Sequence, residues 1–243
     1  MHEQDELMVG RLSEDERLAI SGYAARASWP EGFQIYERGA VADGIFLVLR
    51  GCVVLRSRVR AGRAFVPWVA TAGETFGAEG LASNSVYATD ARADEETETL
   101  YLSTAKMRAF VREQPTHALS LIGQVMGERV SLLEKLRELT TLSVEQRLLA
   151  SLRRMGTHAG FLDAKGRIEL SASRYRLLCE LVGATRESVS LVLGRLTGEG
   201  LVERVGSTLF VMPSERLLAR LDGRADTAVL APRLGESGSV ELQ

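Results

Sequence analysis

The chain has 243 residues, of which 45% are hydrophobic and 26% charged, and its formal net charge is −2. This composition is typical of a globular protein with room for two domains, and it excludes a disordered chain. No apolar run approaches the ~20 residues of a membrane span, and the N-terminus is acidic where a secretory signal is basic, so we expect a cytoplasmic protein outside the membrane.

The charge is divided unevenly along the chain. Residues 1–140 hold 16 Lys and Arg against 20 Asp and Glu, whereas residues 141–220 hold 12 against 8. An acidic N-terminal part joined to a basic C-terminal part fits a sensor joined to a nucleic-acid binder.

The N-terminal part is predicted to be a short helix followed by a β-domain. Ser13 and Glu16 form a capping-box pattern, which predicts a helix over residues 11–27. From Trp29 to about Leu102, short alternating runs predict an antiparallel β-roll or barrel, although the periodicity fits a small β-domain without a ligand equally well. The turns are marked by Gly32, Gly39, Gly44, Gly51, Gly62, Gly73, Gly77 and Gly80.

A long helix is predicted over residues 115–139. Its apolar residues recur every three or four positions, as in a coiled-coil seam, over a stretch too long for either neighbouring domain to cover. We therefore expect this helix to pair with its own copy in a parallel homodimer; the alternative is a helix packed entirely on its own β-domain. The seam consists of Leu119, Ile122, Met126, Val130, Leu133 and Leu136.

The C-terminal part begins with a predicted hinge at residues 140–142. Ser143 and Gln146 then form a second capping box, which predicts a helix to about Met155, and residues 160–170 are predicted to be a loop and a short strand. The chain thus divides into a β-roll domain (1–114), a dimerisation helix (115–139), a helical C-terminal domain (140–222) and a flexible tail (223–243).

Residues 170–211 carry the pattern of a winged helix-turn-helix. Gly183 supplies the sharp bend between two helices, and Thr185 can cap the second helix. The second helix buries one apolar face and leaves Arg186, Glu187 and Ser190 on the other. Two β-rich runs around Gly206-Ser207 then predict a short hairpin, the wing. The apolar residues of the two helices are Leu177, Leu178, Leu181, Val182, Val189, Val192, Leu193 and Leu196.

Taken together, a glycine-punctuated β-roll, a long seam helix and the run Val182-Gly183-Ala184-Thr185-Arg186-Glu187-Ser188-Val189-Ser190 resemble the CRP/FNR family of bacterial transcription regulators. The resemblance covers roughly residues 12–212. It implies an α+β fold with an antiparallel β-roll of the double-stranded β-helix type, a long dimerisation helix and a winged helix-turn-helix. It also implies palindromic double-stranded DNA, a second copy of the chain and RNA polymerase as partners.

The same resemblance assigns the DNA-binding residues. Arg186 would contact guanine O6 and N7, and Glu187 would accept a hydrogen bond from cytosine N4. Leu191 stands where family members commonly carry Arg, so it could touch only a thymine methyl group, and the target site is expected to differ from the best-known consensus. The expected DNA-facing set is Ser173, Arg174, Thr185, Arg186, Glu187, Ser188, Ser190, Leu191, Arg195 and Ser207.

The corresponding effector pocket departs from cyclic-nucleotide-binding members. Those members supply a Glu for the ribose and an Arg-Ser pair for the phosphate, whereas this chain has Ala78 and Ala88-Thr89 at the aligned positions. Glu79 is one place away, and on a strand it would point to the opposite face. We therefore expect no binding of cAMP in the usual mode and leave the effector unidentified. The aligned pocket positions are Gly77, Ala78, Glu79, Ala88, Thr89, Met126, Leu133 and Glu134.

Other cofactors and functions have weaker sequence support. Two cysteines, Cys52 and Cys179, exclude the four-cysteine iron–sulfur mode, and no His or Cys pair suggests haem or another metal. Arg56, Arg58 and Arg60 alternate on one predicted strand and could bind a cyclic dinucleotide, although a solvated hairpin is the more common reason for such a row. No catalytic set appears, which argues against an enzyme; a protein-binding dimer without DNA binding is the remaining alternative.

Overall fold

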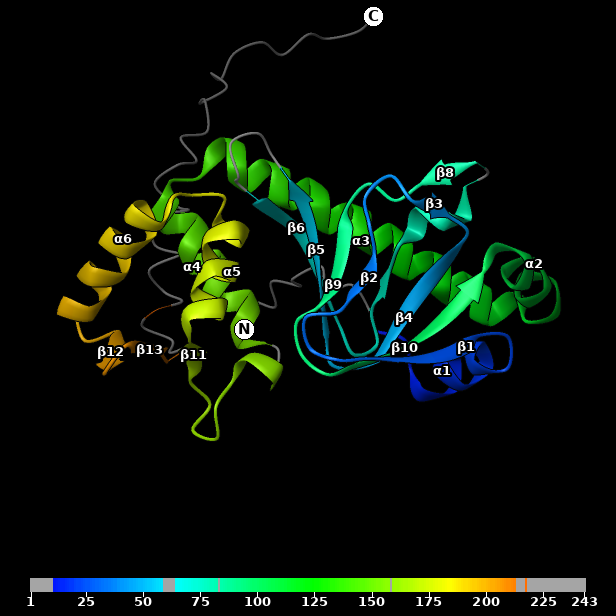
Figure 1. Ribbon diagram of the computed structural model, residues 1–243, viewed down its shortest axis with the longest axis horizontal. Coiled ribbons are helices and arrows are strands. Elements are labelled where there is room, and N and C mark those ends of the chain that lie inside the picture. Colours follow the sequence, from blue (N-terminus) through cyan, green and yellow to red (C-terminus); the bar gives the residue numbers. More distant parts are fainter. Residues whose placement is uncertain (1–10, 59–63, 83, 158, 213–216, 218–243) are drawn as a thin grey trace, which may run out of the picture.

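The computed structural model describes residues 11–58, 64–82, 84–157, 159–212 and 217. The predicted tail at 223–243 and Arg60 lie outside the described residues. Figure 1 shows a β-rich N-terminal domain and a helical C-terminal domain, with the long helix α3 lying over the first and reaching the second. No helix in the described ranges combines the length and the apolar character needed to cross a membrane.

The N-terminal domain is an antiparallel β-roll, as predicted. Two four-stranded sheets have the orders β1-β10-β4-β7 and β2-β9-β5-β6, and β3 pairs with β8. Val48, Val53 and Phe76 are fully buried between the sheets. The strands are β1 (Ala25–Trp29), β2 (Gln34–Tyr36), β3 (Val41–Ala42), β4 (Gly44–Arg50), β5 (Cys52–Arg58), β6 (Ala64–Thr71), β7 (Thr75–Phe76), β8 (Ser85–Val86), β9 (Asp90–Ala93) and β10 (Thr97–Ser103).

Two glycines in the roll are required by local geometry. Gly51 joins β4 to β5 with φ +91°, a left-handed conformation in which a Cβ would also lie 2.5 Å from the Thr97 hydroxyl. A Cβ on Gly80 would lie 2.1 Å from the backbone oxygen of Gly44, so the segment after β7 can approach β4 only without a side chain there.

The helices around the roll differ in part from the prediction. Helix α1 (Glu14–Ser21) has the predicted capping box at Ser13, but it ends before residue 27, because residues from Ala25 onward pair with β10 instead. Helix α2 (Thr104–Glu113) was not predicted as a separate element. Ser103 is its N-terminal cap, and Phe110 on its inner face is fully buried.

Helix α3 (Pro115–Thr141) confirms the predicted long helix and is two residues longer. The predicted hinge at 140–142 is wrong at its first two residues, because Thr140 and Thr141 are helical and Leu142 is the C-terminal cap. One face of α3 is buried on its own chain, through Ala118, Leu121, Gln124 and Lys135.

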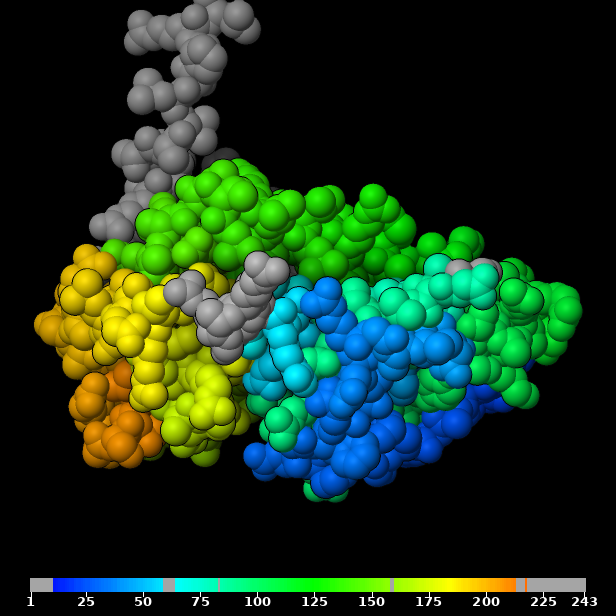
Figure 2. All heavy atoms as spheres, turned by 45° about the horizontal axis from the view of Figure 1, so that its top comes forward, coloured from blue at the N-terminus to red at the C-terminus, as the bar shows by residue number. Residues whose placement is uncertain are grey.

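The opposite face of α3 is apolar and uncovered. In Figure 2 the surface of α3 forms a continuous green band along one face of the molecule. Five of the six predicted seam residues are strongly exposed. Their exposed fractions run from 49% for Met126 to 69% for Leu119. These exposed residues are Leu119, Ile122, Met126, Leu133 and Leu136.

The C-terminal domain is a winged helix-turn-helix. The elements are α4 (Val144–Gly156), β11 (Ile168–Leu170), α5 (Ala172–Val182), α6 (Arg186–Gly198), β12 (Val202–Val205) and β13 (Thr208–Val211). The predicted capping box of Ser143 and Gln146 is present at the start of α4. The three strands form one sheet in the order β11-β13-β12, so the predicted wing hairpin is joined by the short strand before α5.

The two domains share one apolar cluster. Cys52, Val54 and Val66 of the β-roll are buried in the same cluster as the core of the C-terminal domain, including Leu178 of α5. Beside it, the Arg56 guanidinium donates to the Glu180 carboxylate at 2.8 Å, with both side chains mostly buried. The helix-turn-helix therefore packs directly on strands β5 and β6 in this conformation.

Candidate nucleic-acid interface and effector pocket

The turn into α6 is built as the sequence predicts. Gly183 ends α5 in the left-handed conformation, with φ 64°. Thr185 is the N-terminal cap of α6, and its hydroxyl accepts a hydrogen bond from the Ser188 backbone N–H at 3.3 Å. Val189 and Leu193 on the inner face of α6 are fully buried, which fixes the direction of its outer face.

The outer face at the start of α6 carries the predicted base-contacting side chains. Arg186, Glu187 and Ser190 are exposed, and Leu191 is 70% exposed. Hydrogen bonds from its own backbone N–H and from the Thr185 hydroxyl hold the pKa of Glu187 below its usual value, so the side chain is an ionised acceptor. Ser207 is exposed at the turn of the wing.

Tyr175 of α5 supports the first residue of α6, and sequence reasoning missed it. The Arg186 guanidinium lies over the Tyr175 ring at 5.3 Å from its centroid. The Tyr175 hydroxyl donates to the Arg186 backbone oxygen at 3.5 Å. Partial burial raises the pKa of Tyr175, and the nearby Ser190 hydroxyl and Arg186 guanidinium offset part of that rise. No local sequence pattern links Tyr175 to Arg186, because their contact depends on how the two helices pack.

Two of the predicted DNA-facing arginines are engaged within the chain. Arg195 donates to the Glu145 carboxylate of α4 at 2.8 Å. Arg174 donates to the backbone oxygens of Gly160 and Phe161, at 2.8 and 3.4 Å. The Arg195 side chain is still 53% exposed, so its ion pair leaves it on the surface, whereas Arg174 is only partly exposed.

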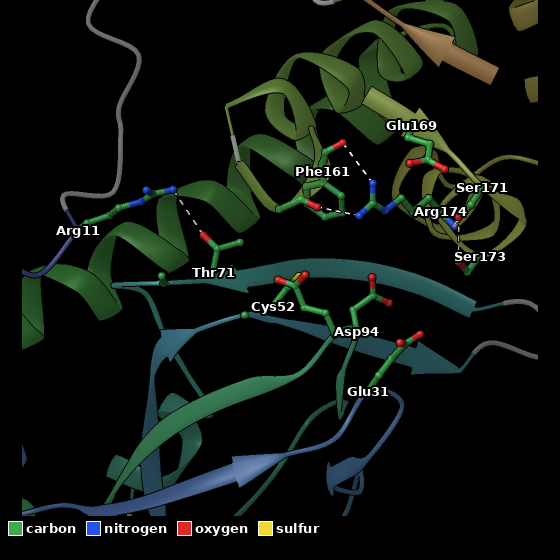
Figure 3. Close-up of a pocket in the computed structure, with 14 residues that line it drawn as sticks. Arg11, Glu31, Cys52, Thr71, Asp94, Phe161, Glu169, Ser171, Ser173 and Arg174 are labelled. Atoms are coloured by element: carbon green, nitrogen blue, oxygen red, sulfur yellow. Dashed lines mark hydrogen bonds between the residues drawn. The ribbon is translucent and has the colours of Figure 1, made fainter. Parts of the chain in front are cut away.

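Arg174 lies at a cavity between the two domains. The cavity has a volume of about 440 Å³, and Ser173 also lines it. Figure 3 shows Asp94 and Glu31 on the β-roll side facing Arg174 on the opposite wall. Burial raises the pKa of Asp94, and the nearby guanidiniums of Arg56 and Arg174 offset part of that rise. An acidic wall of this kind does not suit a phosphate ligand.

The predicted effector pocket begins at Gly77, which has φ +77°, and continues into a short 3₁₀ turn over Ala78–Leu81. The prediction that Glu79 lies on a strand and points away is wrong, because in the turn its carboxylate accepts a hydrogen bond from the Ala88 backbone N–H at 3.1 Å. Glu79 therefore faces the segment that carries the aligned phosphate positions.

Aromatic side chains fill the roll next to that segment. Tyr36 and Tyr87 are stacked with ring centroids 3.7 Å apart, and the Tyr87 hydroxyl donates to the backbone oxygen of Gly44. Tyr36 is 8% exposed, and its hydroxyl has no hydrogen bond with suitable geometry among the described residues. Burial raises its pKa, Glu79 adds to the rise, and the Thr89 hydroxyl nearby opposes it.

The helix side of the pocket is acidic as well. Glu128 of α3 is mostly buried, and one of its carboxylate oxygens has no hydrogen-bond partner in the described part of the chain. Burial raises its pKa to about 7, and the negative charges of Glu79 and Glu74 contribute to that rise. Glu79 contacts the segment aligned with the phosphate position, and the Glu128 carboxyl lies near Glu79, so carboxyl groups stand where a cyclic nucleotide would need a cation.

The remaining predicted pocket residues lie elsewhere. Met126 and Leu133 are 49% and 59% exposed on the uncovered face of α3, and Glu134 is exposed beside them. The spacing on α3 directs these three side chains away from the β-roll of their own chain, so the structure does not bring them together with Gly77, Ala78, Ala88 and Thr89.

The predicted cationic row on β5 is neutralised where the structure describes it. Arg56 is paired with Glu180, as described above, and Arg58 donates to the Asp90 carboxylate at 2.9 Å. The pairing of β5 with β6 also shifts register between Leu55 and Ser57, which breaks the strict alternation assumed from the sequence. These pairings do not support an open anion site.

A β-roll, a long helix with an uncovered apolar face and a winged helix-turn-helix define a class of effector-controlled DNA-binding proteins. Comparison with known families agrees with this class. Residues 26–114 match the cyclic nucleotide-binding domain, and residues 146–221 match the Crp-like helix-turn-helix domain.

Curated relatives extend the match to most of the chain. The cyclic AMP receptor protein of Thermus thermophilus is 31% identical over 196 residues, which cover 81% of this chain and 87% of that protein. The cAMP-activated global transcriptional regulator Vfr of Pseudomonas aeruginosa is 26% identical over 182 residues, covering 73% and 84%. The chain belongs to the CRP/FNR family and is a DNA-binding transcription regulator rather than an enzyme.

Solved structures of low sequence identity show the same fold. The c-di-GMP-responsive global regulator CLP of Xanthomonas campestris superposes with a TM-score of 0.70 at 18% identity, covering 83% of this chain and all of that one. FixK2 of Bradyrhizobium japonicum superposes with a TM-score of 0.68 at 21% identity, covering 82% and 96%. The predicted α+β fold is thereby confirmed.

Proposed function

We propose that this chain acts as a homodimer that reads a palindromic DNA site through the start of α6, under the control of an effector other than a cyclic mononucleotide bound in the usual mode. The observation that carries the proposal is the exposed pair Arg186 and Glu187 at the capped start of α6. CRP-family regulators bind DNA, typically as dimers, through this element.

The base contacts follow from the side-chain chemistry. Arg186 can donate two hydrogen bonds to guanine O6 and N7, and the ionised Glu187 can accept one from cytosine N4. Leu191 can contact a thymine methyl group. Thr185, Ser188 and Ser207 would lie near phosphates, which position the helix without reading sequence.

The homodimer is supported by the uncovered face of α3. Exposed leucines spaced along 20 Å or more of a helix, about 1.5 Å per residue, are costly in water and are satisfied by a second copy. A dimer also explains how one short helix gains specificity, because two copies read half-sites about one helical turn apart.

Control by an effector would act through α3. A change in the β-roll would shift the α3 helices of the two copies relative to each other, and Leu142 at the end of α3 would pass the shift to the spacing of the two α6 helices. Several relatives are named for cAMP, but in this chain the aligned segment lacks the Arg-Ser pair and faces Glu79.

The DNA-reading role of Arg186 is tested by its replacement. Arg186→Ala should lower affinity for the specific site by ~1 to 3 kcal/mol and relax the preference at one base pair in each half-site. Fluorescence anisotropy with specific and random duplexes measures both. Arg108→Ala, an exposed arginine on α2, is the control for the change in charge. An equal loss of affinity for specific and random DNA would show that Arg186 contacts only phosphate.

The effector prediction is tested by calorimetry. A cyclic mononucleotide would bury its phosphate beside carboxylates without a paired cation. Titration with cAMP or cGMP should therefore give no dissociation constant below ~0.1 mM, which corresponds to a binding free energy of about −5.5 kcal/mol. The dimer without added nucleotide should already bind DNA or respond to a different compound. Micromolar affinity for cAMP coupled to tighter DNA binding would refute this assignment of the pocket.

A further inference from the structure

Tyr175 and Arg186 form a contact between the two helices of the helix-turn-helix. The centre of the Arg186 guanidinium is 5.3 Å from the Tyr175 ring centroid, inside the ~6 Å range of cation–π interactions. The Tyr175 hydroxyl also donates to the backbone oxygen of Arg186, at 3.5 Å. One side chain of α5 thus contacts both the backbone and the side chain of the first residue of α6.

A contact between a guanidinium and an aromatic ring can leave the hydrogen-bonding edge of the arginine available. Stacking uses the flat face of a guanidinium, whereas recognition of guanine uses the N–H groups at its edge. An unsupported arginine on a protein surface samples many rotamers, and that freedom is lost when it binds a base. A ring that already restricts the guanidinium lowers this cost before DNA arrives.

We propose that Tyr175 is a positioning residue for sequence recognition, which holds the Arg186 guanidinium ready for bidentate contact with a base. The inference rests on the proposed function, in which Arg186 reads a guanine. The ring carries the effect, because the hydroxyl contact is long and goes to the backbone. Tyr175 should therefore affect discrimination between base pairs more than affinity for DNA in general.

Two substitutions separate the ring from the hydroxyl. Tyr175→Phe keeps the aromatic face, and Tyr175→Leu keeps apolar bulk at this partly buried position but removes the face. On the specific site we expect Tyr175→Phe to bind within about twofold of the wild type and Tyr175→Leu to bind about three- to tenfold more weakly. Neither should change affinity for random duplex DNA, and melting temperatures of both variants verify that they fold.

A double-mutant cycle with Arg186→Ala tests whether the effect passes through the arginine. In the Arg186→Ala background, Tyr175→Leu should cost almost nothing further on the specific site. Three results would overturn the proposal: additive losses in the cycle, an equal loss for Tyr175→Phe and Tyr175→Leu, or an equal loss on random DNA, the last indicating a phosphate contact. The proposed function is tested separately by the Arg186→Ala single variant. If that variant keeps the base preference of the wild type, Arg186 does not read a base.

Discussion

Leu136→Glu should dissociate the dimer and abolish specific DNA binding. Leu136 is 58% exposed on the uncovered face of α3, so the substitution is well tolerated by the isolated chain. In a dimer the same position would place two carboxylates in an apolar seam without partners, a cost of several kcal/mol for each buried charge. Because one helix-turn-helix reads only half a site, loss of the dimer removes most of the specific affinity.

Light scattering and DNA-binding assays on the same samples measure this effect. Val111→Glu is the matched control, since Val111 is 44% exposed on α2 and lies outside the seam. The control should remain dimeric and bind DNA normally. A Leu136→Glu variant that is still dimeric at micromolar concentration would place the interface on another surface.

Glu128→Gln should stabilise the protein at neutral and alkaline pH. The folded chain raises the pKa of Glu128 to about 7 because the side chain is buried and lies near the carboxylates of Glu79 and Glu74. The unfolded chain should have an ordinary glutamate pKa near 4.5. Between these two pKa values the folded state binds more protons than the unfolded state. The stability linked to Glu128 is therefore fully present below pH ~4.5 and is lost as pH rises through 7.

The size of this effect follows from the shift. The difference between the folded and unfolded pKa of Glu128 corresponds to roughly 3 kcal/mol of folding stability lost by pH 8. A neutral glutamine avoids this loss. Urea unfolding at pH 5, 6, 7 and 8, at one fixed concentration of protein, gives the difference between variant and wild type. Glu37→Gln, which replaces an exposed acid just after β2, is the control for the change in charge. A constant difference between Glu128→Gln and wild type across this range would contradict the raised pKa.

The sequence predicted those elements whose signals are local. The turn at Gly183, the cap at Thr185 and the buried face of α6 depend on residues within a few positions of one another, and all are present in the structure. The capping boxes at Ser13 and Ser143 belong to the same class. Periodicity likewise identified α3, although it extends two residues past its expected end.

Features that depend on distant parts of the chain were not predictable in the same way. Helix α1 ends early because the residues from Ala25 onward form a strand that pairs with β10, which lies far away in the sequence. The partners of Arg174 and Arg195 come from other elements, so their engagement could not be read from helix position alone. Glu79 was misplaced because a glycine-rich 3₁₀ turn after β7 replaced the assumed strand.

The candidate site divides along the same line. Arg186, Glu187 and Ser190 were identified from the spacing on one helix and are exposed there. Tyr175, which contacts Arg186 from the preceding helix, became visible only with the packing angle of the two helices. The acidic pair of Glu79 and Glu128 joins a turn of the β-roll to α3, and no local pattern links these two positions.

Selection of binding sites from random duplex DNA tests most directly whether two copies of this chain read DNA through α6. The purified full-length protein should enrich a palindrome with half-site centres ~10 bp apart, and its affinity should fall steeply with salt. The same selection with Arg186→Ala should lose the preference at one base pair in each half-site. If no sequence is enriched and binding shows no salt dependence, the helix-turn-helix serves another purpose, such as contact with a protein, and the DNA-reading role assigned to Arg186 is contradicted.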